Sequence, residues 1–439
     1  MPLHLLTTPP MMLGLVVFIA AFSYLALVRP LALLASLAAL WIVTVALSRS
    51  VTVSVVASGV QIYPVDLLAL IMAAIGTTRL LKSGLTTLGS RLTLLLMTLF
   101  VLYVSRGIVE VGVQTAINSA RGPFYFLAAI AYAASVPGGW DARIWKVFSI
   151  TGLLLASLAV PFWLTGGLGS AGEMGMHNGE LVTSRPIVAA GALVILQAAI
   201  LFLALRWPSK RLASLAAMWC VVVLVLLQHR TLWVAGLLVA AVGIVWWLLT
   251  LDRRHERAAV ATIGIMIPLL PIAAGAFLAT GPLVRSTGTA VGTNSTLNWR
   301  VTGWEELLKA HHSVAQLTVG EPSGASINRS IDQQTVDVSA HNEFVESYLR
   351  FGILGFLTLI WIGLLLRFKR GRVASGIGLT RQAVGLLLLA QFISCITYSL
   401  DAIQGIITGA LLSGLVANDA VHPIRAQWRR PAVVERAQR

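Results

Sequence analysis

The sequence predicts an all-α fold, that of a polytopic helical membrane protein with about twelve transmembrane helices. Of its 439 residues, 57% are hydrophobic and only 11% are charged, and the mean hydropathy is +0.85. A soluble globular protein carries roughly 25% charged residues. Apolar runs of roughly 20 residues recur along almost the whole chain, which is the length a helix needs to cross a hydrocarbon core of about 30 Å. The composition therefore excludes a soluble enzyme and a disordered protein.

The expected spans follow one another along the chain with mostly short connections. They cover residues 11–28, 31–47, 62–78, 92–105, 122–136, 144–164, 186–205, 212–228, 231–249, 259–279, 344–366, 383–398 and 402–417. The first two are joined only by Arg29-Pro30 and can form one broken crossing or a shallow hairpin, so we expect about twelve crossings with both termini inside. The first ten residues lack Lys and Arg, so no cleavable signal peptide is expected. The chain divides into helices at 1–279, a large loop at 280–343, helices at 344–417 and a basic tail at 418–439.

The net charge of +15 comes mainly from short basic segments between the apolar runs. This distribution follows the positive-inside rule, so these segments and the C-terminal tail are expected in the cytoplasm. It favours a lipid bilayer over nucleic acid as the partner. The main basic groups are Arg79, Lys82 and Arg91; Arg143 and Lys146; Arg206, Lys210 and Arg211; Arg253, Arg254 and Arg257; and Arg367, Lys369, Arg370 and Arg372.

The polar segment 280–343 is the longest interruption between apolar runs, and the basic loops on either side place it outside the cell membrane. Long loops of this kind are often functional. Within it, Asn298 to His311 has the pattern of a short amphipathic helix, with Arg300 and Trp304 one turn apart. Its two Trp residues favour a helix lying at the membrane surface.

The end of this loop carries the strongest local signal, a histidine followed by a glycine pattern. On a helix with about 100° per residue, His341, Val345, Tyr348, Gly352 and Gly355 share one face. The glycines would let a neighbouring helix approach closely, while His341 would present a general base at the membrane boundary. The alternative is a solvated interfacial histidine beside an ordinary packing seam. Glu346 and Arg350 are spaced for a structural ion pair.

Several arginines lie at the expected outer face, against the positive-inside trend. Arg230 interrupts a long apolar stretch, and Arg300 lies in the large loop. Guanidinium groups match phosphate oxygens with paired hydrogen bonds, so both are candidates for binding an anionic group. Arg121 and Arg185 each precede a proline that starts an apolar run. For these two, phosphate binding at a helix start competes with snorkelling or helix capping.

Other catalytic patterns are missing from the sequence. It contains no Asp-x-Asp or Asp-x-Glu, no Walker A motif and no dinucleotide-binding glycine pattern, so we expect no metal and no cofactor. The two cysteines, Cys220 and Cys395, provide no disulfide framework. Carboxylates are nearly absent from the spans, which disfavours a proton-coupled transporter.

On these motifs the sequence resembles the O-antigen ligases, within the O-antigen ligase/polymerase family. That family carries His followed by Asn, Ser or Gln, nine residues, then Gly-x-x-Gly, and here His341-Asn342 is followed after nine residues by Gly352-Ile353-Leu354-Gly355. The two essential arginines of the family resemble Arg230, in His229-Arg230-Thr231-Leu232-Trp233, and Arg300, in Asn298-Trp299-Arg300. The resemblance in topology covers the whole chain, and the motifs cover about 25 residues.

The resemblance implies a glycosyltransferase C-like fold with a periplasmic loop containing short helices, in the bacterial inner membrane. It implies transfer of O-antigen polysaccharide from undecaprenyl diphosphate to a sugar hydroxyl of lipid A–core at the periplasmic face. His341 would be the general base, with Arg230 and Arg300 binding the diphosphate, and inversion by single displacement is the simpler hypothesis. We expect the substrate to be contacted by Arg121, Arg185, Trp233, Asn298, Trp304, Asn342 and Tyr348.

Three alternatives stay open. An O-antigen polymerase would use the same donor, but such proteins tend to have two large periplasmic loops. A protein-glycosylating oligosaccharyltransferase shares the motifs and usually carries a further C-terminal soluble region. A lipid or solute transporter would explain the spans and arginines without any chemistry.

Overall fold

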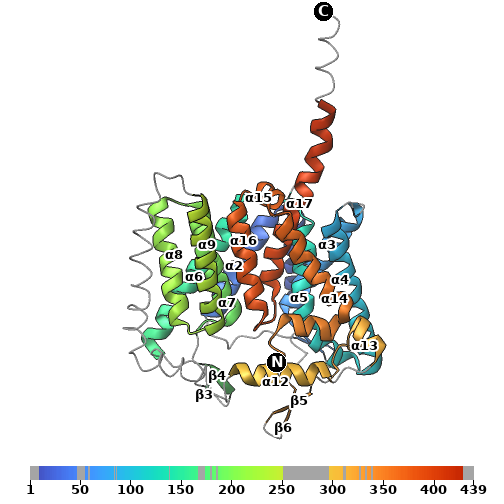
Figure 1. The fold of residues 1–439 in the computed structure, drawn as a ribbon. Helices are drawn as coiled ribbons and strands as arrows, with labels where there is room; N and C mark the ends of the chain where they lie inside the picture. The colour runs from blue at the N-terminus through green and yellow to red at the C-terminus, as the bar shows by residue number, and fades with distance from the viewer. Residues whose placement is uncertain are drawn as a thin grey trace, which may run out of the picture.

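The computed structural model shows a bundle of long helices, with one shorter helix, α12, lying crosswise at one end (Figure 1). It describes residues 9–46, 55–57, 60–83, 85, 87–137, 139–166, 174–177, 180–183, 186–250, 296–309, 313–325, 328–331, 334–337 and 340–428. The helices are α1 Pro9–Val28, α2 Pro30–Ala46, α3 Pro64–Lys82, α4 Leu88–Glu110, α5 Val113–Ala134, α6 Ala142–Gly166, α7 Ala189–Leu205, α8 Lys210–Leu226, α9 Arg230–Thr250, α12 Thr296–Lys309, α13 Val314–Val319, α14 Glu343–Phe368, α15 Arg370–Ile377, α16 Arg381–Cys395 and α17 Ala402–Trp428.

Three short antiparallel hairpins accompany the helices. They pair β1 Val55–Ala57 with β2 Val60–Ile62, β3 Met174–His177 with β4 Glu180–Thr183, and β5 Asn328–Ile331 with β6 Gln334–Asp337. The sequence analysis did not predict these hairpins. Each joins only two strands, so the architecture remains that of a helical bundle.

Every expected span that falls on described residues coincides with a helix; most ends are shifted by a few residues, but α5 begins nine residues earlier than expected and α17 ends eleven residues later. The expected span 259–279 and the start of the large loop, 280–295, lie outside the described residues. Among the described residues, four helical segments are long and apolar enough to cross a membrane, namely Pro64–Lys82, Leu88–Glu110, Ala142–Leu164 and Glu343–Phe368. Large apolar side chains also point outward from α8, among them Leu212, Leu215 and Met218. Such exposed apolar surface suits lipid contact.

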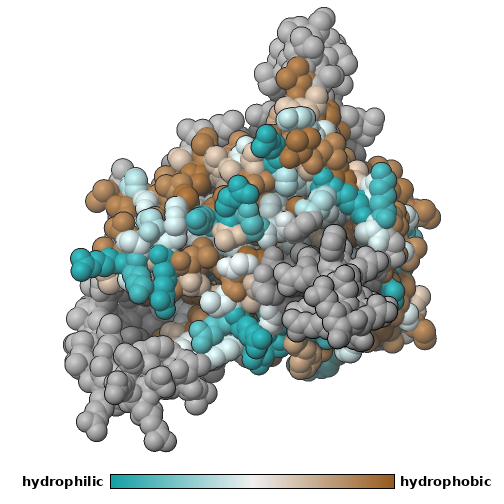
Figure 2. Space-filling model, turned by 90° about the horizontal axis from the view of Figure 1, so that it is seen from above, coloured by the Kyte–Doolittle hydropathy of each residue, from teal (hydrophilic) through white to brown (hydrophobic). Residues whose placement is uncertain are grey.

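The basic connections gather at one end of the bundle, which we call the α15 end. Lys146 at the start of α6 lies over the Trp207 ring at 5.2 Å, and Arg370 lies over Trp246 at 4.7 Å. The Trp145 indole N–H donates to the carbonyl of Ile377 at 3.0 Å, which ties α6 to α15. Figure 2 looks down on this end and shows hydrophilic residues spread between hydrophobic ones. The opposite end, which we call the α12 end, carries the residues singled out by the motifs.

Small residues let α17 lie directly against α5 in the centre of the bundle. A Cβ at Gly405 would lie 2.4 Å from the carbonyl oxygen of Phe126, and one at Gly409 would lie 2.6 Å from that of Ile130. This spacing of four residues forms a small-residue seam of the kind that packs membrane helices. The sequence analysis did not single out this close contact between α5 and α17.

Gly352 allows a close approach of a neighbouring helix, as predicted, but it does so at a kink in α14. Its φ is +63°, and the helical geometry of α14 breaks there. A Cβ at Gly352 would lie 2.3 Å from the carbonyl of Thr318, and one at Gly320 would lie 2.3 Å from that of Arg350, so the two glycines let the end of α13 lie against the α14 backbone. A Cβ at Gly355 would meet Phe351 of its own helix. The prediction of one continuous helical face through both glycines was wrong because α14 is kinked.

Candidate functional site

His341 lies just before α14 and not on it. Its φ is +49°, and the next residue, Asn342, caps the helix by accepting hydrogen bonds from the N–H groups of Phe344 (2.9 Å) and Val345 (3.1 Å). Asn strongly favours this N-cap position. The prediction that His341 lies on the helix was therefore wrong, and its half-buried side chain projects from the turn before α14. Asn342 was expected to contact substrate, but its side-chain oxygen accepts these two hydrogen bonds at the helix start.

Helix α12 docks on this turn through its tryptophan. The Trp304 indole N–H donates to the carbonyl of Ala340 at 2.7 Å, directly before His341. Trp304 and Tyr348 also pack against a small buried cluster formed by Leu307, Ala340 and Leu349. Both aromatic residues were expected to contact substrate, and their described contacts are this hydrogen bond of Trp304 and the packing against the cluster. They place α12, and with it Arg300, beside the start of α14.

The connection between α16 and α17, residues 396–401, contacts both the helix that carries Arg300 and the start of the helix that carries Arg230. Arg300 Nη1 donates to the carbonyl of Thr397 at 3.3 Å, and the guanidinium lies over the Tyr398 ring at 5.8 Å. The Thr397 hydroxyl donates to the hydroxyl of Thr231 at 2.7 Å, and Thr231 follows Arg230 directly. The Nε atoms of both arginines are buried. Arg230 and Arg300 therefore belong to one connected cluster at the α12 end.

The tight turn before α9 is built around a buried histidine. His229 is 2% exposed, and its Nε2 lies 2.9 Å from the carbonyl oxygen of Ile187, so Nε2 carries the proton. Its Nδ1 lies 3.5 Å from the Tyr398 hydroxyl. The Trp233 indole, another expected substrate contact, donates to the carbonyl of Leu224 at 3.2 Å across the turn between α8 and α9. These contacts hold the start of α9, where Arg230 begins the helix.

A buried carboxylate that the sequence analysis missed connects the 396–401 segment to α14. Glu343 is 7% exposed. Its Oε2 accepts the Leu400 N–H at 2.7 Å, and its Oε1 accepts the Ser347 hydroxyl at 2.9 Å. Glu346 accepts the His341 N–H at 3.2 Å and forms the expected ion pair with Arg350, with 2.7 Å between Oε2 and Nη2. In the sequence, the acidic residue two positions after His341 could have indicated that Glu343 takes part in the site.

Arg121 does not join this cluster through its described contacts. Its Nε lies 3.4 Å from Asp66 Oδ1 on α3, its Nη1 donates to Asn118 Oδ1 at 2.8 Å, and its guanidinium lies over the Tyr63 ring at 4.8 Å. The Tyr125 hydroxyl also donates to Asp66. Arg121 and Pro123 lie inside α5, so the expectation that Arg121 lies just before a helix start was wrong, while its binding to phosphate stays a prediction. Arg185 lies outside the described residues, and so does the side chain of Asn298 in the first turn of α12.

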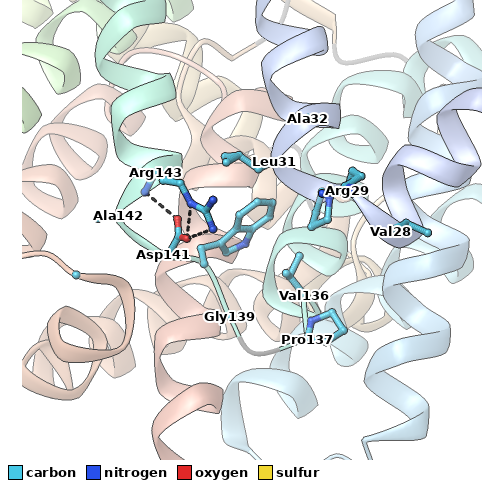
Figure 3. Close-up of a pocket in the computed structure, with 13 residues that line it drawn as sticks. Val28, Arg29, Leu31, Ala32, Val136, Pro137, Gly139, Asp141, Ala142 and Arg143 are labelled. Carbon is cyan, nitrogen blue, oxygen red and sulfur yellow. Dashed lines mark hydrogen bonds and ion pairs between the residues drawn. The ribbon is translucent and has the colours of Figure 1, made fainter.

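A cavity of about 690 Å³ opens at the α15 end, away from the predicted residues. Figure 3 shows its walls, formed by the α1–α2 junction, the α5–α6 connection and Gly378. Its charged residues include Arg143 and Asp141, which are paired with each other at 2.6 Å and whose side chains are 72% and 53% exposed. The hydrogen bond from Arg143 holds the pKa of Asp141 below its usual range. This ion pair is therefore largely solvated, and the cavity contains none of the motif residues.

Across the part of the chain that the structure describes, no group of three His, Cys, Asp or Glu side chains is arranged to hold a metal ion. The described groups at the α12 end include the imidazoles of His229 and His341, the guanidinium groups of Arg230 and Arg300, and the buried carboxylates of Glu343 and Glu346. A guanidinium pair can bind a diphosphate, and an imidazole can accept a proton.

Comparison with models of protein families and with curated proteins finds no match to this chain. The resemblance to the ligase family consequently depends on the motif residues and on how the structure groups them.

Proposed function

We propose that this protein is an O-antigen ligase, a membrane glycosyltransferase. It transfers O-antigen polysaccharide from undecaprenyl diphosphate to a sugar hydroxyl of lipid A–core. The observation that supports this proposal is the linkage of the three motif segments at one end of the bundle. Thr397 touches both Arg300 and the residue after Arg230, and Trp304 of the Arg300 helix touches the residue before His341.

In the proposed reaction, Arg230 and Arg300 bind the diphosphate and stabilise the charge that develops on it as the glycosidic bond breaks. The hydroxyl oxygen of the acceptor attacks the anomeric carbon, and His341 takes the hydroxyl proton. The bonding electron pair leaves with the diphosphate, which is a good leaving group without a general acid. One displacement inverts the anomeric configuration.

In the proposed topology, about twelve helices cross the bacterial inner membrane. The α12 end faces the periplasm, where both lipid-linked substrates are found, and the basic α15 end faces the cytoplasm. The separation of the basic segments from the motif residues, at opposite ends of the bundle, supports this orientation. Cysteine accessibility at α12 and at α15 in intact cells tests it.

Reconstitution of the purified protein in lipid vesicles tests the activity. The vesicles contain undecaprenyl diphosphate-linked glycan, with or without lipid A–core, and the assay includes a chelator. Glycan on lipid A–core is the expected product. Longer lipid-linked chains formed without acceptor would identify a polymerase. Glycan attached to an added acceptor protein would identify an oligosaccharyltransferase. Movement of the glycan lipid across the membrane without a new bond would identify a transporter.

A further inference from the structure

Glu343 and Glu346 are both buried at the start of α14, but they have different partners. Glu346 is 1% exposed and pairs with Arg350 within its own helix. Glu343 instead accepts one hydrogen bond from its own helix, from Ser347, and one from the backbone N–H of Leu400 in the 396–401 segment. A buried carboxylate is costly unless its oxygens are hydrogen-bonded, and here both oxygens accept a bond. Glu343 is thus a bridge between two chain segments.

The two bridged segments carry different parts of the proposed chemistry. The 396–401 segment holds Arg300 through the Thr397 carbonyl and the Tyr398 ring. The start of α14 follows His341 directly, and Glu346 holds the His341 backbone. A bond between Glu343 and Leu400 therefore sets the spacing between the segment that holds a phosphate-binding arginine and the turn that carries the base.

We infer that Glu343 is a positioning residue for the transfer reaction, fixing the diphosphate-binding arginine relative to the base through its hydrogen bond to Leu400. This inference rests on the proposed function. Glu343 touches neither substrate, and it acts by keeping the donor carbon and the acceptor hydroxyl in the geometry for attack. A misplacement on the scale of an ångström is enough to slow a reaction that depends on such alignment.

Two variants distinguish the effect of the hydrogen bonds of Glu343 from the effect of its negative charge. Glu343→Gln keeps an oxygen that can accept the Leu400 N–H, and its amide N–H can donate to the Ser347 hydroxyl, so the bridge survives without the charge. Glu343→Ala removes both bonds. We expect Glu343→Ala to lower kcat by about 10- to 100-fold, with the affinity for undecaprenyl diphosphate changed by less than about 3-fold. Glu343→Gln should restore kcat to within about 3-fold of wild type.

A matched control removes a buried hydrogen-bonding side chain elsewhere in the bundle. Gln391 on α16 donates to the Thr408 hydroxyl at 2.9 Å and is 7% exposed. Gln391→Ala should lower the Tm in detergent, as Glu343→Ala does, but leave kcat near that of wild type. The comparison therefore separates loss of stability from loss of positioning.

The experiment measures kcat, KM, Tm and undecaprenyl diphosphate binding for wild type and the three variants. Equal kcat for Glu343→Ala and Gln391→Ala would reduce Glu343 to a structural role and overturn the inference. A Glu343→Gln protein as slow as Glu343→Ala would also overturn it, since the charge and not the bridge would then matter. Absence of transfer by the wild-type protein would instead refute the proposed function, so the two failures are distinguishable.

Discussion

The hydroxyl group of Thr397 donates a hydrogen bond to the hydroxyl group of Thr231 over 2.7 Å. The two residues are far apart in the chain, and their contact joins the connection between α16 and α17 to the first turn of α9. Because the carbonyl of Thr397 also accepts from Arg300, one residue links the neighbourhoods of both phosphate-binding candidates.

The Thr231–Thr397 bond should contribute measurably to stability and to arginine placement. We expect Thr231→Val and Thr397→Val each to lower the free energy of unfolding by ~0.5–1.5 kcal/mol, the net value of one hydrogen bond. Since both variants remove the same bond, the double variant should cost less than the sum of the single changes. Denaturation of the four proteins in detergent measures the coupling, and strict additivity would show that the bond contributes nothing.

The Arg300→Lys variant should lose most of its transfer activity although it keeps the positive charge. A lysine ammonium cannot reproduce the planar pair of donors that a guanidinium presents to a phosphate, so kcat/KM should fall by about 100-fold or more. Arg106→Lys is the matched control at the same end of the molecule. Arg106 donates to the Gly320 carbonyl at 2.7 Å and its Nε lies 3.5 Å from Glu110 Oε1, and a lysine ammonium can keep the charge pairing without a planar fork, so transfer should stay near normal. Wild-type activity in Arg300→Lys would refute paired phosphate recognition.

His341→Ala should abolish transfer while the donor still binds. Loss of a general base slows a reaction by about 10²- to 10⁴-fold, whereas the arginines that bind the diphosphate are untouched. Transfer assays and binding of undecaprenyl diphosphate measure the two effects separately, and added imidazole should partly restore the rate. Near-normal transfer by His341→Ala would remove this residue as the base.

Gly352→Ala should destabilise the protein by ~1–3 kcal/mol, because the new Cβ meets the Thr318 carbonyl and an L-residue is strained at this positive φ. The control is Gly363→Ala in the same helix, where a Cβ would meet nothing within 4 Å. That change should be neutral or stabilising, since Ala favours a helix more than Gly. Thermal unfolding of the two variants in parallel provides the measurement, and equal Tm values would refute the packing at Gly352.

The helices were predictable because long apolar runs can satisfy their backbone groups in lipid only as helices. The amphipathic pattern of Asn298 to His311 likewise predicted α12, whose bounds differ by two residues at each end. Four residues of separation between Glu346 and Arg350 predicted their ion pair. In each case the information is local, so it can be read from neighbouring residues.

Other features of the site depend on contacts that no local pattern contains. Arg121 meets Asp66, and Leu400 meets Glu343, only after distant helices have packed. The position of His341 could have been predicted better, because Asn342 is a favoured N-cap residue and places the helix start after it. The kink at Gly352 arises where α13 lies against α14, and so it depends on tertiary structure.

The 396–401 segment is the latest part of the cluster to be translated. Thr397 in this segment follows Thr231 by 166 positions and Arg300 by 97, and Arg300 gains its carbonyl partner and aromatic neighbour only once the segment has left the ribosome. A nascent chain stalled after α14 would thus contain all three reactive groups without the segment that assembles them. If the proposed function holds, we therefore expect no transfer activity from such a truncated chain, even though it contains all three groups.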